Sequence, residues 1–128
     1  MRRLLLDTHA LLWWLSDDSQ LGSNARQLIE EGQNIVYVSA VSAWEISIKK
    51  SLGKLEAPDD LGQILGQEGF EELPISFFHG ERAGELPSIH RDPFDRMLVA
   101  QAQAEGLDII TRDANIAKYG IKTIAANL

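Results

Sequence analysis

The chain contains no cysteine, which excludes a disulfide framework and any metal site built on thiolates. It also lacks a run of about 18 apolar residues, so the sequence predicts no membrane span. Two arginines precede Leu4–Leu6, but Asp7 interrupts this apolar run too soon for a secretory signal. We therefore expect a cytoplasmic protein that does not depend on a membrane.

Positive charge is also scarce, because 12 Lys and Arg face 19 Asp and Glu, for a net charge of −7. This balance argues against a protein that coats nucleic acid through its overall field. It does not exclude an enzyme acting on nucleic acid, since a carboxylate-rich metal site contributes negative charge itself. No Walker-type or GxGxxG glycine loop is present, so a nucleotide cradle made of backbone amides is not supported.

What is present indicates one α/β domain spanning residues 1–128. The chain is 45% hydrophobic and 24% charged, as is typical of a globular protein. Strand-like runs alternate with helical patterns, which is the rhythm of a parallel, doubly wound sheet. We expect strands at 4–6, 35–38, 72–76, 107–111 and 121–124. The expected helices cover 9–15, 24–31, 40–52, 58–67, 77–86, 93–105 and 114–119, with Ser23 as the N-cap of the second.

Two acids follow predicted strands. Asp7 comes directly after Leu4–Leu6, and Asp113 comes after the strand that ends at Thr111. In open α/β sheets the ligand crevice lies outside the carboxyl ends of the parallel strands. Asp7 is therefore expected at the mouth of such a crevice. For Asp113 taken alone, a role as the cap of the next short helix is the favoured explanation.

A third acid, Glu45, lies on the helix predicted from residue 40. This helix has an apolar stripe that includes Trp44, so we expect Trp44 in the core. At 100° per residue, Glu45 falls at the edge of that stripe. The alternative is an exposed i,i+4 pair of Glu45 with Lys49. The stripe consists of Val41, Trp44, Ile48 and Leu52.

The segment HRDPFDR carries the densest local signal. Asp92 followed by Pro93 predicts an N-cap and first helical residue. Asp95 then occupies the third position, where the helix dipole favours a carboxylate. It also shares the core-facing stripe with Leu98 and Val99, so we expect it to point toward the strand ends.

Four acids from remote parts of the chain are thus expected at one edge of the sheet. Carboxylates within a few Å of each other cannot all stay ionised without a cation. Oxygen ligands select hard ions, Mg²⁺ or Mn²⁺ rather than zinc. One or two such ions held by acids is an arrangement suited to phosphodiester hydrolysis.

The chain resembles PIN-domain nucleases, especially the VapC-type toxins of bacterial toxin–antitoxin pairs, in four blocks that follow the family's order. These are LLLDTHALLWWL, VSAVSAWEISIKKSLGKL, HRDPFDRMLVAQA and IITRDANI. The resemblance implies an α/β/α sandwich with a central five-stranded parallel sheet flanked by helices. It also implies Mg²⁺- or Mn²⁺-dependent endoribonuclease activity, a homodimer and a cognate antitoxin that blocks the site.

Carried over to this sequence, the family's acidic set is Asp7, Glu45, Asp95 and Asp113. Thr8 and Thr111 could hydrogen-bond the metal-binding carboxylates, and Asp92 matches a frequent extra acid. Lys49, Arg96 and Arg112 could hold phosphates of a structured RNA such as tRNA or rRNA, although each could equally pair with a carboxylate. His9 and His90 are expected to be orienting or incidental rather than catalytic. By analogy with the family, the antitoxin would be basic.

Two alternatives remain. A receiver-like phosphotransfer domain is also small, acidic and Mg²⁺-binding, but it needs paired acids after the first strand and a lysine after a late one. Here Asp7 stands alone and Thr111 is followed by Arg112. A non-catalytic PIN module that only binds RNA or protein is the second alternative.

Overall fold

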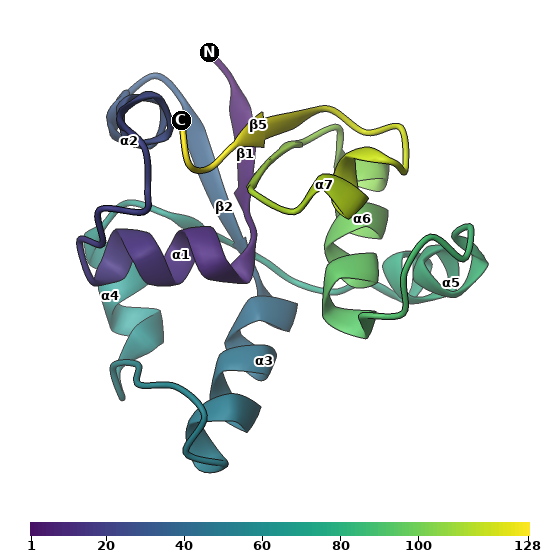
Figure 1. Cartoon of the computed structure of the whole chain (residues 1–128), viewed down its shortest axis with the longest axis horizontal. Helices are drawn as coiled ribbons and strands as arrows, with labels where there is room; N and C mark the ends of the chain where they lie inside the picture. The colour runs from purple at the N-terminus through teal and green to yellow at the C-terminus, as the bar shows by residue number, and fades with distance from the viewer.

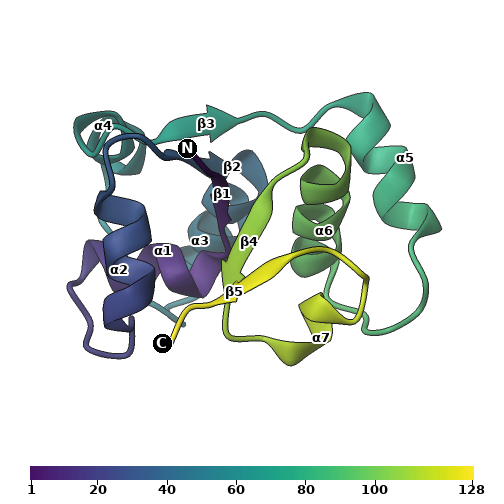
Figure 2. The same ribbon diagram turned by 90° about the horizontal axis from the view of Figure 1, so that it is seen from above.

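The computed structural model describes all residues from Met1 to Leu128. Its centre is a five-stranded sheet in the order β3-β2-β1-β4-β5, and every neighbouring pair is parallel. The sheet and its flanking helices are shown in Figure 1 and, from above, in Figure 2. The strands are β1 (Arg3–Leu6), β2 (Ile35–Ser39), β3 (Glu71–Leu73), β4 (Asp108–Thr111) and β5 (Thr123–Ala125). This confirms the predicted α/β/α sandwich.

Seven helices connect the strands and cover both faces of the sheet. They are α1 (Thr8–Leu15), α2 (Ser23–Glu30), α3 (Ala40–Ser51), α4 (Leu61–Gln67), α5 (Phe77–Glu85), α6 (Pro93–Glu105) and α7 (Ala114–Ala117). None of them has the length and hydrophobicity that crossing a membrane requires.

Strand β1 holds the two layers together because its successive side chains point to opposite faces. Leu4 and Leu6 belong to an apolar cluster with α1 and α2, whereas Leu5 belongs to a second cluster with α6. All three leucines are fully buried. The continuous apolar run of β1 is therefore explained by a central parallel strand covered on both sides.

Helix α3 differs from the predicted stripe. Val41 is buried, but Leu52 is exposed and Trp44 has 59% of its surface accessible, so the placement of Trp44 in the core was wrong. The buried face instead contains Val41, Ser42, Glu45 and Ile46. Glu45 therefore lies within the buried face of the helix rather than at its edge.

Some predicted boundaries also shift. Gly22, not Ser23, is the N-cap of α2, and β5 begins two residues later than the predicted strand at 121–124. Strand β3 lies at the sheet edge and ends at Leu73 rather than at the predicted residue 76, because Pro74 cannot donate a backbone hydrogen bond to a neighbouring strand. The Gly22 position is explained by the chain end, since a Cβ there would overlap the backbone of Leu128.

Candidate active site

The carboxyl ends of the central strands place two acids side by side in the fold. Asp7 follows β1 directly, and Asp113 follows β4, the strand paired with β1. Asp7 also caps α1, since its Oδ1 accepts a hydrogen bond of 2.8 Å from the amide of Ala10. Asp113 caps α7 through the amide of Asn115. Helix capping thus fixes both acids at the same edge of the sheet.

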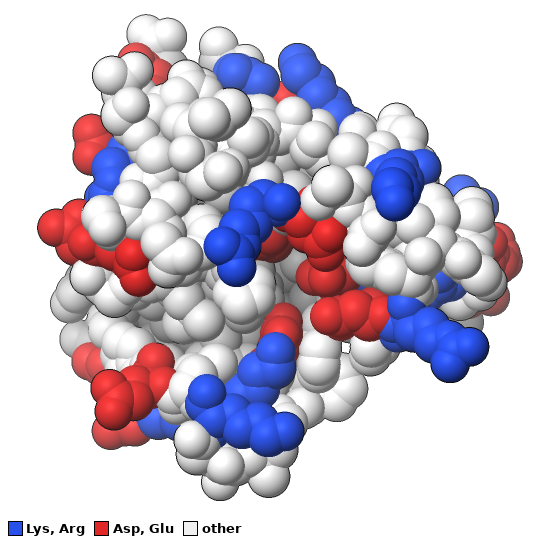
Figure 3. Space-filling view, viewed as in Figure 1, with Lys and Arg blue, Asp and Glu red and all other residues white.

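Helices α3 and α6 add the other two predicted acids, Glu45 and Asp95, at that edge. Together the four line a hollow of about 390 Å³ whose walls contain five carboxylates and two cations. Figure 3 shows acidic side chains gathered in a hollow on this face, with basic side chains around its rim. The lining residues are Asp7, Thr8, His9, Glu45, Lys49, Asp92, Asp95, Arg112, Asp113 and Ala114.

Glu45 is held from both sides of its carboxylate. Thr8 donates a hydrogen bond of 2.7 Å to Oε1, and Lys49 Nζ lies 2.5 Å from Oε2. The side chain is only 6% exposed. The predicted Glu45–Lys49 pair therefore exists, but it lies at the wall of the hollow rather than on a solvated face. The hydrogen bond to Glu45 raises the pKa of Lys49 above its ordinary value.

Burial and repulsion between carboxylates destabilise the ionised form of two of the acids. Burial raises the pKa of Asp95 to about 7, and the charges of Asp92, Asp7, Asp113 and Glu45 add to that rise. Burial also raises the pKa of Asp7, against the opposing effect of a hydrogen bond from the side chain of Thr111. The hollow therefore favours any cation that can neutralise these groups.

The two threonines and Asp92 each have a defined contact. Thr8 bonds Glu45, as described above, and Thr111 Oγ1 accepts the amide of Asp113 at 3.0 Å. Asp92 Oδ1 accepts the amides of Phe94 and Asp95, so it caps α6 as predicted. Asp92 is nevertheless exposed on the rim of the hollow.

The three cations predicted to contact phosphate differ in whether they already have partners within the chain. Arg112 is exposed, forms no ion pair and lies with Cζ 5.1 Å from the centre of the Trp13 ring. Lys49 is paired with Glu45. Arg96 has a structural role instead, since its guanidinium donates to the carbonyls of Ala83, Leu86 and Pro87. The prediction that Arg96 contacts RNA is therefore not retained.

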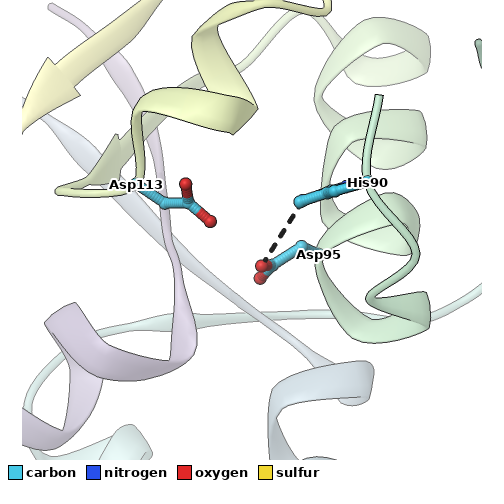
Figure 4. Close-up of side chains that lie close together, drawn as sticks. All are labelled: His90, Asp95 and Asp113. Carbon is cyan, nitrogen blue, oxygen red and sulfur yellow. Dashed lines mark ion pairs between the residues drawn. The ribbon is translucent and has the colours of Figure 1, made fainter. Parts of the chain in front are cut away.

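One further side chain reaches the acids. His90 precedes α6, and its Nε2 lies 3.7 Å from Asp95 Oδ2, with Asp113 on the opposite side (Figure 4). One ligand atom of each of these residues lies within 4.8 Å of the others, close enough for a shared ion. The sequence offered only proximity to Asp95 as a signal for His90, and we had assigned it an orienting or incidental role.

Comparison with known proteins agrees with this geometry. The sequence model of the PIN domain matches residues 4–122. The chain belongs to the PIN-domain family. Ribonuclease VapC22 of Mycobacterium tuberculosis (strain ATCC 25618 / H37Rv) is 27% identical over 122 residues, which are 93% of each chain.

Solved structures with the same fold cover the PIN domain almost completely. VapBC2 from Rickettsia felis, bound to a DNA fragment from their promoter, matches with a TM-score of 0.70 at 15% identity, over 95% of this chain and 97% of the other. A toxin–antitoxin complex from Klebsiella pneumoniae matches with 0.66 at 23% identity, over 96% and 97%. DNA-bound VapBC from Salmonella typhimurium matches with 0.70 at 18% identity, over 97% and 98%.

The PIN domain thus carries an oxygen-rich hollow at the sheet edge where this fold class places ligands. Its donor set of carboxylates suits a hard divalent ion, and the neighbouring acids add to the rise that burial causes in the pKa of Asp95. The four predicted acids line this one hollow, and Asp95 and Asp113, with His90, bring ligand atoms within 4.8 Å of one another. The carboxylates present fit a Mg²⁺ or Mn²⁺ ion.

Proposed function

We propose that this PIN domain is a VapC-type endoribonuclease, the toxin of a toxin–antitoxin pair, and that its activity depends on Mg²⁺ or Mn²⁺. The observation that carries the proposal is the hollow lined by Asp7, Glu45, Asp95 and Asp113, whose acids repel one another without a cation. The relative named ribonuclease VapC22 supports an RNA substrate.

The acids of the hollow would hold one or two ions. Asp7 and Glu45 approach from the side of α1 and α3, while Asp95 and Asp113 approach from the side of α6 and α7. Once bound, such an ion activates the attacking water and stabilises negative charge at the scissile phosphate. Thr8 keeps Glu45 in place, and Thr111 keeps Asp113 and Asp7 in place.

The remaining cations of the hollow would receive the RNA. Arg112 is exposed beside the acids and has no carboxylate partner, so it is available to a phosphate. Lys49 pairs with Glu45 at the wall of the hollow and would contact a phosphate that enters beside it. These local cations would hold RNA despite the net charge of −7.

The partners follow from the same comparisons. The structural neighbours include toxin–antitoxin complexes, and we infer that this chain likewise forms a homodimer bound by a cognate antitoxin. An acidic chain suits a basic antitoxin, whose arginine could enter the acidic hollow. Mixing the chain with the product of the neighbouring gene should give a stable complex that no longer cleaves RNA, whereas two separate species would remove this part of the proposal.

Asp7→Asn provides the central test. The variant keeps the size and the helix-capping oxygen of Asp7 but removes its charge. We expect cleavage of a structured RNA with Mn²⁺ to fall more than about a hundredfold, because even groups that only support a metal ligand are worth 10- to 100-fold. Glu68→Gln, on the exposed end of α4, is the control and should cleave as the wild type does.

Three results would contradict the proposal. Full cleavage by the wild type in EDTA would show that the activity does not depend on a metal. Full cleavage by Asp7→Asn would show that the hollow is not the active site. Metal binding without cleavage of any RNA would favour a binding-only module. Sequencing the 5′ ends of RNA after induced expression identifies the bond that is cut.

A further inference from the structure

His90 stands between the acidic hollow and a buried tyrosine. Its side chain is 14% exposed, and Nε2 is buried without a hydrogen-bond partner. The nearest carboxylate oxygen is Asp95 Oδ2, 3.7 Å away. In Figure 4 the ring edge of His90 points toward the Asp95 carboxylate. An unpartnered imidazole nitrogen therefore faces a carboxylate whose pKa is raised by burial and by the neighbouring acids.

The other ring nitrogen of His90 determines where the proton is. Nδ1 lies 2.8 Å from the hydroxyl of Tyr119. The same hydroxyl oxygen receives two N–H groups that can only donate, from the backbone of His90 and from Arg96, each at 3.4 Å. Because these donors use the lone pairs of the phenol, its own proton is directed to Nδ1. A neutral imidazole that accepts at Nδ1 carries its proton at Nε2.

Arg96 makes this arrangement rigid. Its guanidinium donates to the carbonyls of Leu86 and Pro87 at 3.0 and 2.9 Å, and therefore ties the loop before α6 to the helix itself. The same group donates to Tyr119. The buried ring of Tyr119 also lies 5.4 Å from the ring of His90. The imidazole therefore cannot turn without breaking its hydrogen bond to Tyr119.

We propose that His90 is a positioning residue that donates Nε2–H to Asp95 Oδ2 and orients this carboxylate toward the bound ion, with Tyr119 and Arg96 fixing its tautomer. This inference rests on the proposed metal-dependent function. The hydrogen bond would occupy one oxygen of Asp95 and leave the other for the metal. A neutral donor suits this place, since a second cation would compete with the ion that the hollow is built to hold.

The first experiment measures the tautomer directly. Long-range ¹H–¹⁵N NMR spectra of the full chain loaded with Mg²⁺ at pH 8 distinguish the nitrogen that carries the proton. We expect the Nε2–H form in the wild type and a mixture of both forms in Tyr119→Phe, which lacks the hydroxyl proton. An Nδ1–H form with Nε2 bound to the ion, or a doubly protonated ring, would overturn the proposal.

The second experiment measures Mn²⁺ affinity by calorimetry. His90→Phe keeps a planar ring but has no donor, and it should bind Mn²⁺ about 10- to 100-fold more weakly. His90→Gln places an N–H near the position of Nε2 and should stay within about threefold of the wild type. Equal affinity of His90→Phe and wild type, or an equally large loss in both variants, would refute a donor role.

The outcomes separate this inference from the proposed function. If the wild type binds neither Mn²⁺ nor Mg²⁺, the metal-dependent function fails, while the NMR tautomer still tests the His90 donor in the metal-free chain. If the wild type binds the ion and Asp7→Asn does not, the metal site stands, and the NMR tautomer and the His90 variants decide the inference. Circular dichroism in EDTA checks that each variant is folded, and Tyr119→Phe remains informative if His90→Phe is not.

Discussion

Asp95 is a site residue whose ionised form lowers the stability of the metal-free fold. Its carboxylate lies on the core-facing side of α6, partly removed from water and surrounded by other acids. A group whose pKa is raised on folding destabilises the folded state above that pKa, and the penalty disappears as the pH falls toward the unfolded value. For Asp95 this window runs from a pKa of about 7 in the folded chain down to the ordinary pKa of 3.8.

The metal-free chain should therefore melt at a higher temperature at pH 5.5 than at pH 8. Asp95→Asn should raise the stability at pH 8 by about 1–2 kcal/mol, after allowance for solvent screening of a partly exposed side chain and for the lost dipole interaction at the helix start. The variant should also flatten the pH dependence. Thermal melts in EDTA measure both effects, and a variant no more stable than wild type at pH 8 would rule out this account.

Arg112 is the residue that best tests how an acidic protein holds RNA. It is the exposed cation of the hollow without a carboxylate partner. In an Asp7→Asn background, which leaves RNA uncleaved, Arg112→Ala should weaken binding and reduce the slope of log affinity against log salt by about 0.7–1. Fluorescence anisotropy at several salt concentrations measures this slope.

Lys122→Ala is the matched control, because this lysine precedes β5 and therefore lies at the opposite edge of the sheet from the hollow. We expect its salt slope to equal that of the background. Equal slopes for both variants would show that Arg112 does not contact phosphate.

At the scale of elements, helix starts position the site. Asp7, Asp92 and Asp113 each cap the helix that follows them, and each also lines the hollow. The structural and functional explanations of these acids are therefore compatible, since the cap fixes the backbone and leaves the rest of the carboxylate facing the hollow. This explains why Asp113 could be assigned to either role from the sequence.

The start of α2 requires a glycine for packing alone, since no residue there lines the hollow. The amide of Gly22 donates to Ala126, and the amide of Ala25 donates to Leu128, so the chain end packs against this helix start. A Cβ at position 22 would overlap the backbone of Leu128. Gly22→Ala should cost about 1–3 kcal/mol in the free energy of unfolding, as is typical of overpacking.

Urea denaturation measures this loss. Gly32→Ala is its control, because a Cβ at position 32 meets nothing within 4 Å and the backbone there is not left-handed. It should change stability by less than about 0.5 kcal/mol. If both variants unfold at the same urea concentration, the contact with Leu128 does not restrict position 22.

For the whole molecule, ion binding and folding are linked. The hollow joins acids from both ends of the chain, and unfolding would separate them. Mg²⁺ or Mn²⁺ at about a hundred times its dissociation constant should therefore stabilise the chain by about 2.7 kcal/mol. Melts with and without the ion measure this, Asp7→Asn should lose the effect, and EDTA should reverse it. An unchanged melting temperature at saturating metal would contradict the linkage.

The sequence by itself determined the parallel sheet and the place of Asp7, because a buried apolar strand followed by an acid has few arrangements in an α/β protein. It also determined the cap at Asp92, since capping depends on neighbours within three residues. Only the tertiary structure decided the rotation of α3, which exposes Trp44 and buries Glu45. Helical periodicity cannot distinguish an apolar face from one that borders a polar hollow.

The roles of Arg96 and His90 were likewise decided by tertiary contacts. Their partners, the carbonyls of the loop and Tyr119, come from other segments whose approach no local pattern encodes. A charged side chain in a sequence can serve a phosphate or a backbone carbonyl equally well. The difference lies in which groups the folded chain leaves without a partner.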